Sequence, residues 1–352
     1  MKVSVKVPAT SANLGPGFDC LGLALPIYNT ITIEETVLPG TGIEINLMSE
    51  EEVIDEMIFD NIPKDENNIV YKAVEMLYNS IGQEPSELKI NIQSQIPITR
   101  GLGSSAAVIV GGLIAANKLL GSPADETALL SIATEVEGHP DNVAPAILGG
   151  FVMASQEDDG SIVYRKLDWP QDWDITVCIP DFELSTNIAR SVLPEQIPMQ
   201  DAIFNAKHLA MLVEAVNTKD TKLMKIALQD KLHQPYREKL VPGMREIMEA
   251  FKHEDGVLGC VLSGAGPTML IISHKYDVDK IKSTVREIWE GQSIKTDIRT
   301  LKNKLKKPQI WLISSKQENY PDFIDHVITF DSKRDQNSHP YQLQFIASLI
   351  AQ

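Results

Sequence analysis

The sequence is poor in cysteine, with only three among 352 residues. Cys20, Cys178 and Cys260 are far apart, and none belongs to a C-x-x-C pair. This spacing argues against a disulfide scaffold and against a zinc site. We therefore expect three small buried side chains in a reducing compartment.

Long hydrophobic runs and excess positive charge are also lacking. No apolar stretch is long enough to span a bilayer. Met1 leads directly into the alternating pattern "KVSVKV" without the charged and apolar regions of a secretory signal, so we expect a cytoplasmic protein. The net charge of −16 argues against nucleic acid or an anionic membrane as the main partner. A polyphosphate ligand would need local attraction from a helix N-terminus, arginines or a divalent cation.

Length and composition indicate two globular domains, since 43% of the residues are hydrophobic and 23% charged. A polar, turn-rich stretch at 156–174 marks the expected boundary. We expect an N-terminal domain at 1–160, a C-terminal domain at 161–302, and an extension at 303–352. Strands alternate with helices in the second domain, which indicates an α+β fold.

Periodicity predicts the elements around the candidate motifs. Alternation predicts early strands at "VSVKV" and "YNTITIEET", and another at 87–96. Helical spacing predicts helices at 69–82 and 105–121, then one capped by Ser122 that ends at Gly138. In the extension, "IWLISS" and "HVITFDS" suggest strands and "PYQLQFIASLIAQ" a short helix.

The stretch "PITRGLGSSAA", at 97–107, combines glycines with the start of an apolar helix. Backbone N–H groups at such a turn bind anionic oxygens without the lysine of a P-loop. Ser104 and Ser105 are suited to phosphate or Mg²⁺. The same residues match a dinucleotide G-x-G-x-x-A motif, but here the helix is followed by another helix rather than a strand. A plain strand–helix turn with small packing residues is the remaining alternative.

Four further groups of residues suggest a binding site. "VPATSANLGPGFDCLGLAL" contains Asn13 and Asp19, and "EVEGHPDNVAPA" contains a polar cluster after Gly138. Carboxylates in such a cluster hold Mg²⁺ or orient a hydroxyl, and a histidine there suggests a general base. The small-residue loop "LSGAGPT", at 262–268, either folds against the first glycine loop and closes over a ligand or is a plain hairpin or strand–helix turn. Arg190 and Arg237 are candidates for binding a carboxylate. Each motif alone is also compatible with an ordinary turn or a solvated side chain.

Taken in order, "PATSANLGPGFDCLGLAL", "PITRGLGSSAA", "EGHPDNVAPA" and "LSGAGPT" resemble the GHMP family of small-molecule kinases. The resemblance covers residues 1 to about 300 and leaves out the C-terminal extension. It implies an α+β protein of two domains, the first like ribosomal protein S5 domain 2 and the second ferredoxin-like. "TSANLGPGFD" and "EGHPDNVAPA" point to the branch that transfers the γ-phosphoryl group of ATP to L-homoserine in threonine biosynthesis. The family also implies a homodimer.

The resemblance implies roles for individual residues. ATP is expected to contact Pro97, Ile98, Thr99, Arg100, Gly101, Leu102, Gly103, Ser104, Ser105, Ala106, Ala107, Asn68 and Thr186. Mg²⁺ is expected at Ser105 and Glu137, with Glu135 as the alternative if the helix register differs. The substrate is expected to contact Asn13, Asp19, His139, Arg190, Arg237 and Gly264. Asp141 and Asn142 are expected beside the reacting hydroxyl, where Asp141 either accepts its proton or only orients it.

Two other functions stay open on the sequence. A sister kinase acting on mevalonate or a similar alcohol is compatible with Arg190 and Arg237, because such substrates also carry anions. Asp19 argues against that substrate, since a carboxylate suits an ammonium group. A non-catalytic ligand sensor is the second alternative, although such proteins usually lose the phosphate-loop and metal residues that remain here at Ser104, Ser105, Glu137 and Asp141.

Overall fold

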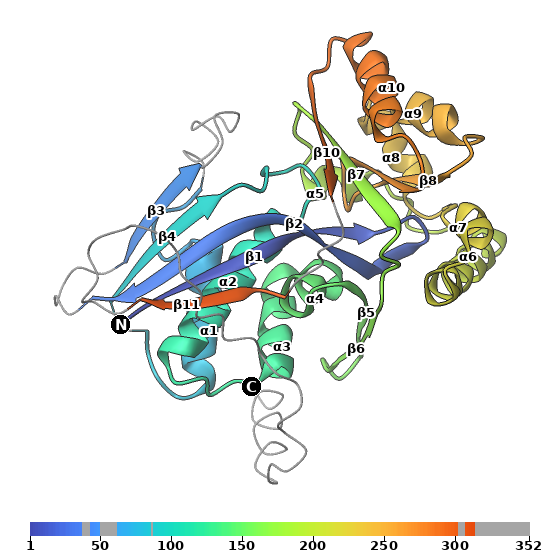
Figure 1. Cartoon of the computed structure of the whole chain (residues 1–352). Coiled ribbons are helices and arrows are strands. Elements are labelled where there is room, and N and C mark those ends of the chain that lie inside the picture. The colour runs from blue at the N-terminus through green and yellow to red at the C-terminus, as the bar shows by residue number, and fades with distance from the viewer. Residues whose placement is uncertain (37–42, 50–61, 86, 302–306, 314–352) are drawn as a thin grey trace.

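The computed structural model describes residues 1–36, 43–49, 62–85, 87–301 and 307–313. Its first part is a seven-stranded sheet with helices on one face (Figure 1). The strands are β1 Lys2–Asn13, β2 Gly17–Glu35, β3 Glu44–Ser49, β4 Leu88–Ser94, β5 Phe151–Gln156, β6 Ile162–Leu167 and β11 Gln309–Ile313. The main strand order is β11-β1-β2-β4-β3, and the β5–β6 hairpin joins through β2. All pairings are antiparallel except β3 with β4.

Four helices cover this sheet: α1 Ile69–Ser80, α2 Ser104–Leu119, α3 Glu126–Glu137 and α4 Pro140–Leu148. α2 is buried on most sides because it packs against β1 and β2 while α1, α3 and α4 surround it. Alternation along β4 places Leu88, Ile90 and Ile92 in the core, as expected. Because α2 is followed by α3 and not by a strand, the dinucleotide-binding alternative is wrong.

The predicted cap of α3 is wrong. Ser122 lies in a turn after α2 with a φ of 66°, and the helix begins only at Glu126. Its N-cap is Asp125, whose side chain accepts a hydrogen bond from the Ala128 N–H. Asp is as good an N-cap as Ser, and the turn needed to leave α2 occupies the first residues of the stretch.

The second part is a four-stranded antiparallel sheet with helices packed beside it (Figure 1). Its strands are β7 Trp173–Pro180, β8 Val257–Leu262, β9 Met269–His274 and β10 Thr296–Leu301. Its helices are α5 Thr186–Ser191, α6 Met199–Thr218, α7 Thr221–Ala227, α8 Gln234–Arg237, α9 Met244–Phe251 and α10 Val278–Glu290, with a 3₁₀ turn at Glu238–Leu240. The strand order β10-β7-β9-β8 follows a β-α-β-β-α-β path, which is the ferredoxin-like arrangement.

The change from one sheet to the other lies later than the expected boundary at 160. β6 still pairs with β5 up to Leu167, and the second sheet begins at Trp173. The extension expected at 303–352 also contributes to the first part, because β11 pairs with β1 over Lys2–Lys6. The strand expected at "HVITFDS" and the helix expected at "PYQLQFIASLIAQ" lie outside the described residues.

The cysteines are free, as expected. Cys178 and Cys260 are buried in the core of the second sheet, where burial raises the pKa of both thiols. Cys20 is half-buried. None of the described helices combines the length and the apolar character needed to cross a membrane.

Candidate active site

The glycine loop connects β4 to α2 and has the geometry of an anion site. Gly103 is the N-cap of α2 with a φ of 64°, and no side chain caps the helix. The first-turn N–H groups of α2 are therefore left for a ligand, and the helix dipole favours a negative one. Gly101 has a φ of 73°, and a Cβ there would lie 2.3 Å from the Ser263 carbonyl oxygen.

The loop 262–268 supports the glycine loop from behind. The Ser263 hydroxyl donates to the Gly101 carbonyl at 2.7 Å, and the Thr268 N–H donates to the Arg100 carbonyl at 3.3 Å. Arg100 itself reaches the end of β7, where its guanidinium donates to the carbonyls of Pro180 and Asp181. It therefore attaches the glycine loop to the second sheet.

A cavity of about 290 Å³ lies between the two parts of the molecule. Most of the expected site residues line it: Asn13, Asp19, Asn68, Ile98, Thr99, Arg100, Gly101, Leu102, Gly103, Ser104, Ser105, Glu137, His139, Asp141, Asn142, Thr186, Arg190, Arg237 and Gly264. Three expected ATP contacts, Pro97, Ala106 and Ala107, are not part of the lining. The side chains of Ala106 and Ala107 are in the core, and the Ala107 N–H already donates to the Gly103 carbonyl.

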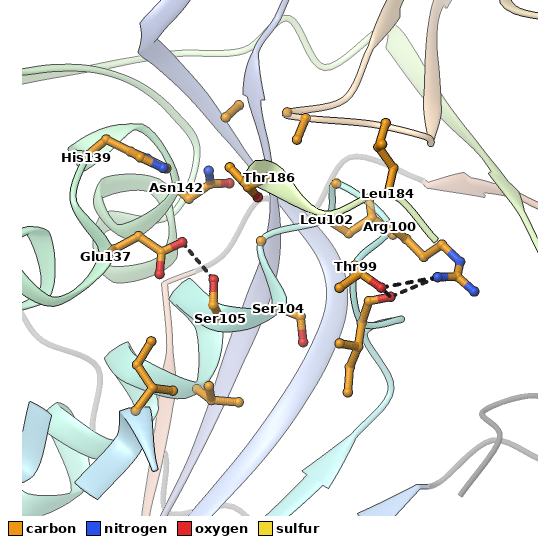
Figure 2. A pocket seen from close by; sticks show the side chains of 18 of the residues that line it. Thr99, Arg100, Leu102, Ser104, Ser105, Glu137, His139, Asn142, Leu184 and Thr186 are labelled. Atoms are coloured by element: carbon orange, nitrogen blue, oxygen red, sulfur yellow. Dashed lines mark hydrogen bonds between the residues drawn. The ribbon is translucent and has the colours of Figure 1, made fainter. Parts of the chain in front are cut away.

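Ser105 and Glu137 face each other from the start of α2 and the end of α3 (Figure 2). The Ser105 hydroxyl donates to Glu137 Oε1 at 2.7 Å. Burial raises the pKa of Glu137, against the opposing effects of the Ser105 hydrogen bond and the charge of His139. Glu135, the alternative ligand, is exposed on another face of α3 and lies outside the cavity lining.

These two residues fit a magnesium ion only in part. Among the described residues, no group of three His, Cys, Asp or Glu side chains is arranged to hold a metal. A hydroxyl and one carboxylate are hard oxygen donors, and Mg²⁺ is commonly held by one or two protein ligands plus substrate phosphates. The pair therefore fits an ion that arrives with a nucleotide.

Asp141 lies in the first turn of α4 and is almost fully buried, with 2% exposure. Its Oδ1 is 2.5 Å from His139 Nδ1 and 3.3 Å from Asn142 Nδ2. Burial lowers the pKa of His139, but the Asp141 hydrogen bond and the negative charges of Asp141, Glu137 and Asp19 outweigh it and raise the pKa overall. Both contacts are made to Oδ1, so one carboxylate oxygen is anchored while the group lines the cavity.

Asp19 and Arg190 form a bidentate ion pair in the cavity lining. Arg190 Nη2 is 2.7 Å from Asp19 Oδ1, and Nη1 is 3.1 Å from Oδ2. The hydrogen bond to Asp19 raises the pKa of Arg190 more than burial lowers it. Asp19 has the left-handed φ of 55°, and its N–H donates to Asn13 Oδ1 at 3.1 Å.

Arg237 is buried beside this pair, with 2% exposure. It donates to the carbonyls of Ala189 and Gly264, at 3.1 and 3.0 Å. Burial, helped by the charge of Arg190, lowers its pKa to about 10. The centre of the Phe18 ring lies 5.2 Å from the Arg237 guanidinium carbon and 5.5 Å from that of Arg190, so one aromatic ring contacts both cations.

The comparison with known proteins matches both parts of the chain. Residues 68–150 match the GHMP kinases N terminal domain and residues 212–291 match GHMP kinases C terminal. A homoserine kinase of Microchaete diplosiphon is 43% identical over 301 residues, which cover 85% of this chain and 94% of the relative. One from Clostridium botulinum strain Langeland is 44% identical over 84% of this chain and 96% of the relative. The chain belongs to the homoserine kinases of the GHMP kinase family.

Solved homoserine kinase structures agree with this assignment. The homoserine kinase of Cytophaga hutchinsonii superposes with a TM-score of 0.78 at 30% identity, covering 88% of this chain and 97% of that one. A mevalonate kinase structure has a TM-score of 0.60 at 19% identity, which shows the shared fold alone. The predicted two-domain α+β kinase fold is thus confirmed.

Several expected homoserine kinase contacts also have structural partners of their own. Asn68 caps α1, accepting from the Val70 N–H and donating to the Pro63 carbonyl. Asn13 donates to the Gly264 carbonyl. Thr186 begins α5, which Ser185 caps. Contacts of these side chains with adenine or substrate stay predictions.

Sequence reasoning missed Phe18, which lines the cavity, and two residues that contact its lining. Thr10 hydrogen-bonds to Asn142, and His233 lies beside Arg237. Thr10 and Phe18 lie inside the motif "VPATSANLGPGFDCLGLAL". Neither side chain carries a charge, so their residue types alone did not mark them as functional. His233 Nε2 is 2.8 Å from the Gly15 carbonyl, and Nδ1 is 3.3 Å from Arg237 Nη1. Its helical i, i+4 spacing to Arg237 is the signal that could have found it.

Proposed function

We propose that the chain transfers the γ-phosphoryl group of ATP to the hydroxyl of L-homoserine, producing O-phospho-L-homoserine. The observation that carries this proposal is the layout of one cavity. The glycine loop at the start of α2, the Asp19–Arg190 pair, and Asp141 with Asn142 all belong to its lining. This supplies a place for phosphate, for a hydroxyl and for charged groups.

The charged side chains of Asp19, Arg190 and Arg237 suit the zwitterion of an α-amino acid. Asp19 offers one negative group beside the two cations of Arg190 and Arg237. An ammonium placed at Asp19 and a carboxylate placed at the arginines would leave each charge paired when the ion pair opens. A mevalonate carboxylate would draw the arginines away and leave Asp19 without a partner, which is costly in a partly enclosed site. The charge pattern therefore favours homoserine.

For the part of the cavity beside the glycine loop, we propose that Ser105 and Glu137 hold Mg²⁺ together with phosphate oxygens. The ion would supply charge neutralisation on the nucleotide phosphates. The chain's own part is positioning: the first turn of α2 holds the phosphates, and Asp141 and Asn142 align the substrate hydroxyl. Phosphoryl transfer depends mainly on such positioning and electrostatics. The fixed Oδ1 of Asp141 favours orientation of the hydroxyl over removal of its proton.

A coupled ADP-release assay tests the substrate assignment. Mg·ATP is offered with L-homoserine, mevalonate or L-threonine at equal concentrations, and we expect turnover with homoserine. Arg190→Gln should raise the KM for homoserine about 10-fold or more and leave the KM for ATP nearly unchanged. Arg245→Gln is the matched control, because Arg245 is exposed and pairs with Glu238 away from the cavity. Turnover on mevalonate alone would overturn the assignment of Asp19, and ATP binding without turnover would favour a ligand sensor.

We propose further that this activity is cytoplasmic and that the chain forms a homodimer. Sedimentation equilibrium of the purified full chain at several concentrations tests the second statement. A single mass near 39.0 kDa would contradict it.

A further inference from the structure

Thr10, near the C-terminal end of β1, contacts both the glycine loop and the start of α4. It is fully buried. Its N–H donates to the Leu102 carbonyl at 3.0 Å, and its hydroxyl donates to Asn142 Oδ1 at 2.7 Å. A Cβ added to Gly103 would lie 1.9 Å from the same hydroxyl oxygen. One side chain thus lies directly against the glycine loop and the start of α4.

The direction of these hydrogen bonds follows from the acid at their end. An ionised carboxylate only accepts, so the Asn142 NH₂ group must face Asp141 Oδ1, which is 3.3 Å away. The Asn142 carbonyl oxygen is then turned to Thr10, whose hydroxyl has to donate. The result is a directed chain of hydrogen bonds from Thr10 through Asn142 to Asp141.

Two neighbouring residues of β1, Ser11 and Asn13, contact a different loop. The Ser11 and Ser263 hydroxyls are hydrogen-bonded at 2.8 Å, and Asn13 Nδ2 donates to the Gly264 carbonyl at 2.9 Å. Both contacts lead to the loop 262–268, behind the glycine loop. Only Thr10, among these three residues, is linked to the carboxylate and amide proposed to align the substrate hydroxyl.

We propose that Thr10 is a positioning residue for phosphoryl transfer. Its hydroxyl holds the Asn142 amide in one orientation and at one distance from the glycine loop, so that the substrate hydroxyl and the transferred phosphoryl group are aligned. The inference rests on the proposed homoserine kinase activity. Thr10 itself does not touch the reacting atoms, and it acts through Asn142 and the backbone of Gly103.

The test compares Thr10→Val, which keeps the shape and removes the donor, with Thr10→Ser, which keeps the donor. We expect Thr10→Val to lower kcat by about 10- to 100-fold, since small misplacements of reacting groups have effects of that size. The KM for ATP should change by less than about 2-fold, because the backbone N–H of Thr10 remains. Thr10→Ser should recover kcat to within about 3-fold of the parent.

Thr176→Val is the matched control for the loss of a buried hydroxyl. Thr176 is also fully buried in a strand and hydrogen-bonds to Thr300 at 3.1 Å, away from the cavity. We expect it to lower the melting temperature about as much as Thr10→Val while leaving kcat unchanged. If Thr176→Val lowers kcat equally, or if Thr10→Ser fails to rescue, the role is structural and the inference is overturned.

A double-mutant cycle keeps the inference testable if Thr10→Val is poorly stable. In the Asn142→Ala background, Thr10→Val should have little further effect on kcat, because its partner is already missing. Additive losses would overturn the inference. An inactive parent protein would instead contradict the proposed function, whereas an active parent with a fully active Thr10→Val variant would contradict this inference alone.

Discussion

At the scale of single residues, Asp141 is the side chain whose role depends most on its neighbours. His139 and Asn142 both lie against its Oδ1. If Asp141 acts as a base, Asp141→Asn and Asp141→Ala should both reduce kcat to a similar low value. If it orients the hydroxyl, Asp141→Asn should retain about 10-fold more activity than Asp141→Ala, because the amide keeps a polar group in place. We expect the second result from single-turnover measurements with saturating ATP.

Two glutamates of α3, Glu137 and Glu135, provide a test of the proposed Mg²⁺ ligand. Glu137→Gln removes the carboxylate that Ser105 contacts, and it should raise the Mg²⁺ concentration needed for half-maximal activity by about 10-fold or more. Glu135→Gln, two positions earlier in α3 and exposed, should leave that concentration unchanged. Titration of activity with MgCl₂ at fixed ATP measures both. Equal behaviour of the two variants would contradict the assignment.

Individual residues were predicted unevenly from the sequence. Glycines, carboxylates and arginines in ordered motifs were identified because their chemistry is visible without a structure. Thr10 was not, since its importance comes from a contact with Asn142, 132 positions away. The burial of Arg237 was also invisible, because it depends on the carbonyls of Ala189 and Gly264. A single sequence does not show which distant segments come into contact.

At the scale of elements, the junction between β4 and α2 depends on the absence of a side chain at Gly103. Gly103→Ala should abolish ATP binding, because its Cβ would lie 1.9 Å from the Thr10 hydroxyl. Gly121→Ala is the matched control: it also has a left-handed backbone, with a φ of 83°, but nothing lies within 4 Å of its added Cβ. Both variants should lose about 1 kcal/mol of stability from backbone strain, and Gly103→Ala should lose more because of the clash. Only Gly103→Ala should lose nucleotide affinity by isothermal titration calorimetry.

The elements next to the glycine loop followed from periodicity, whereas one helix cap and one strand pairing did not. The alternation of β4 and the apolar length of α2 were sufficient to predict both. The cap of α3 was misplaced by three residues because Ser122, Pro123 and Asp125 all satisfy the rules for a helix start. The pairing of β11 with β1 was not predictable, since strand propensity says nothing about which edge a strand will join.

At the scale of the whole molecule, His233 links stability to pH. Burial lowers its pKa below the ordinary 6.5, helped by the charge of Arg237 and opposed by that of Asp230. Below about pH 6.5 the unfolded chain therefore binds a proton that the folded chain does not. The free energy of unfolding should fall as the pH decreases through this value, until the folded pKa is reached.

Denaturant unfolding between pH 5 and 8 measures this dependence. His233→Gln should show a smaller fall in the free energy of unfolding than the parent, because the titrating group is missing. The exposed His253→Gln is the control and should follow the parent curve. A variant at His233 with the full pH dependence would assign the effect to other groups.

The contact between the β1–β2 hairpin and the loop 262–268 has a consequence for how the protein is made. The hydrogen bond from Asn13 to Gly264 joins residues 251 positions apart, and the Ser263 hydroxyl reaches the Gly101 carbonyl from the same loop. On the ribosome, the nucleotide loop emerges long before the segment that supports it. A nascent chain that ends after β6, at Leu167, would therefore carry the phosphate-binding sequence without the loop 262–268 that supports it. We therefore expect the chain to bind ATP only late in translation, after the loop 262–268 in the last third of the polypeptide has been made.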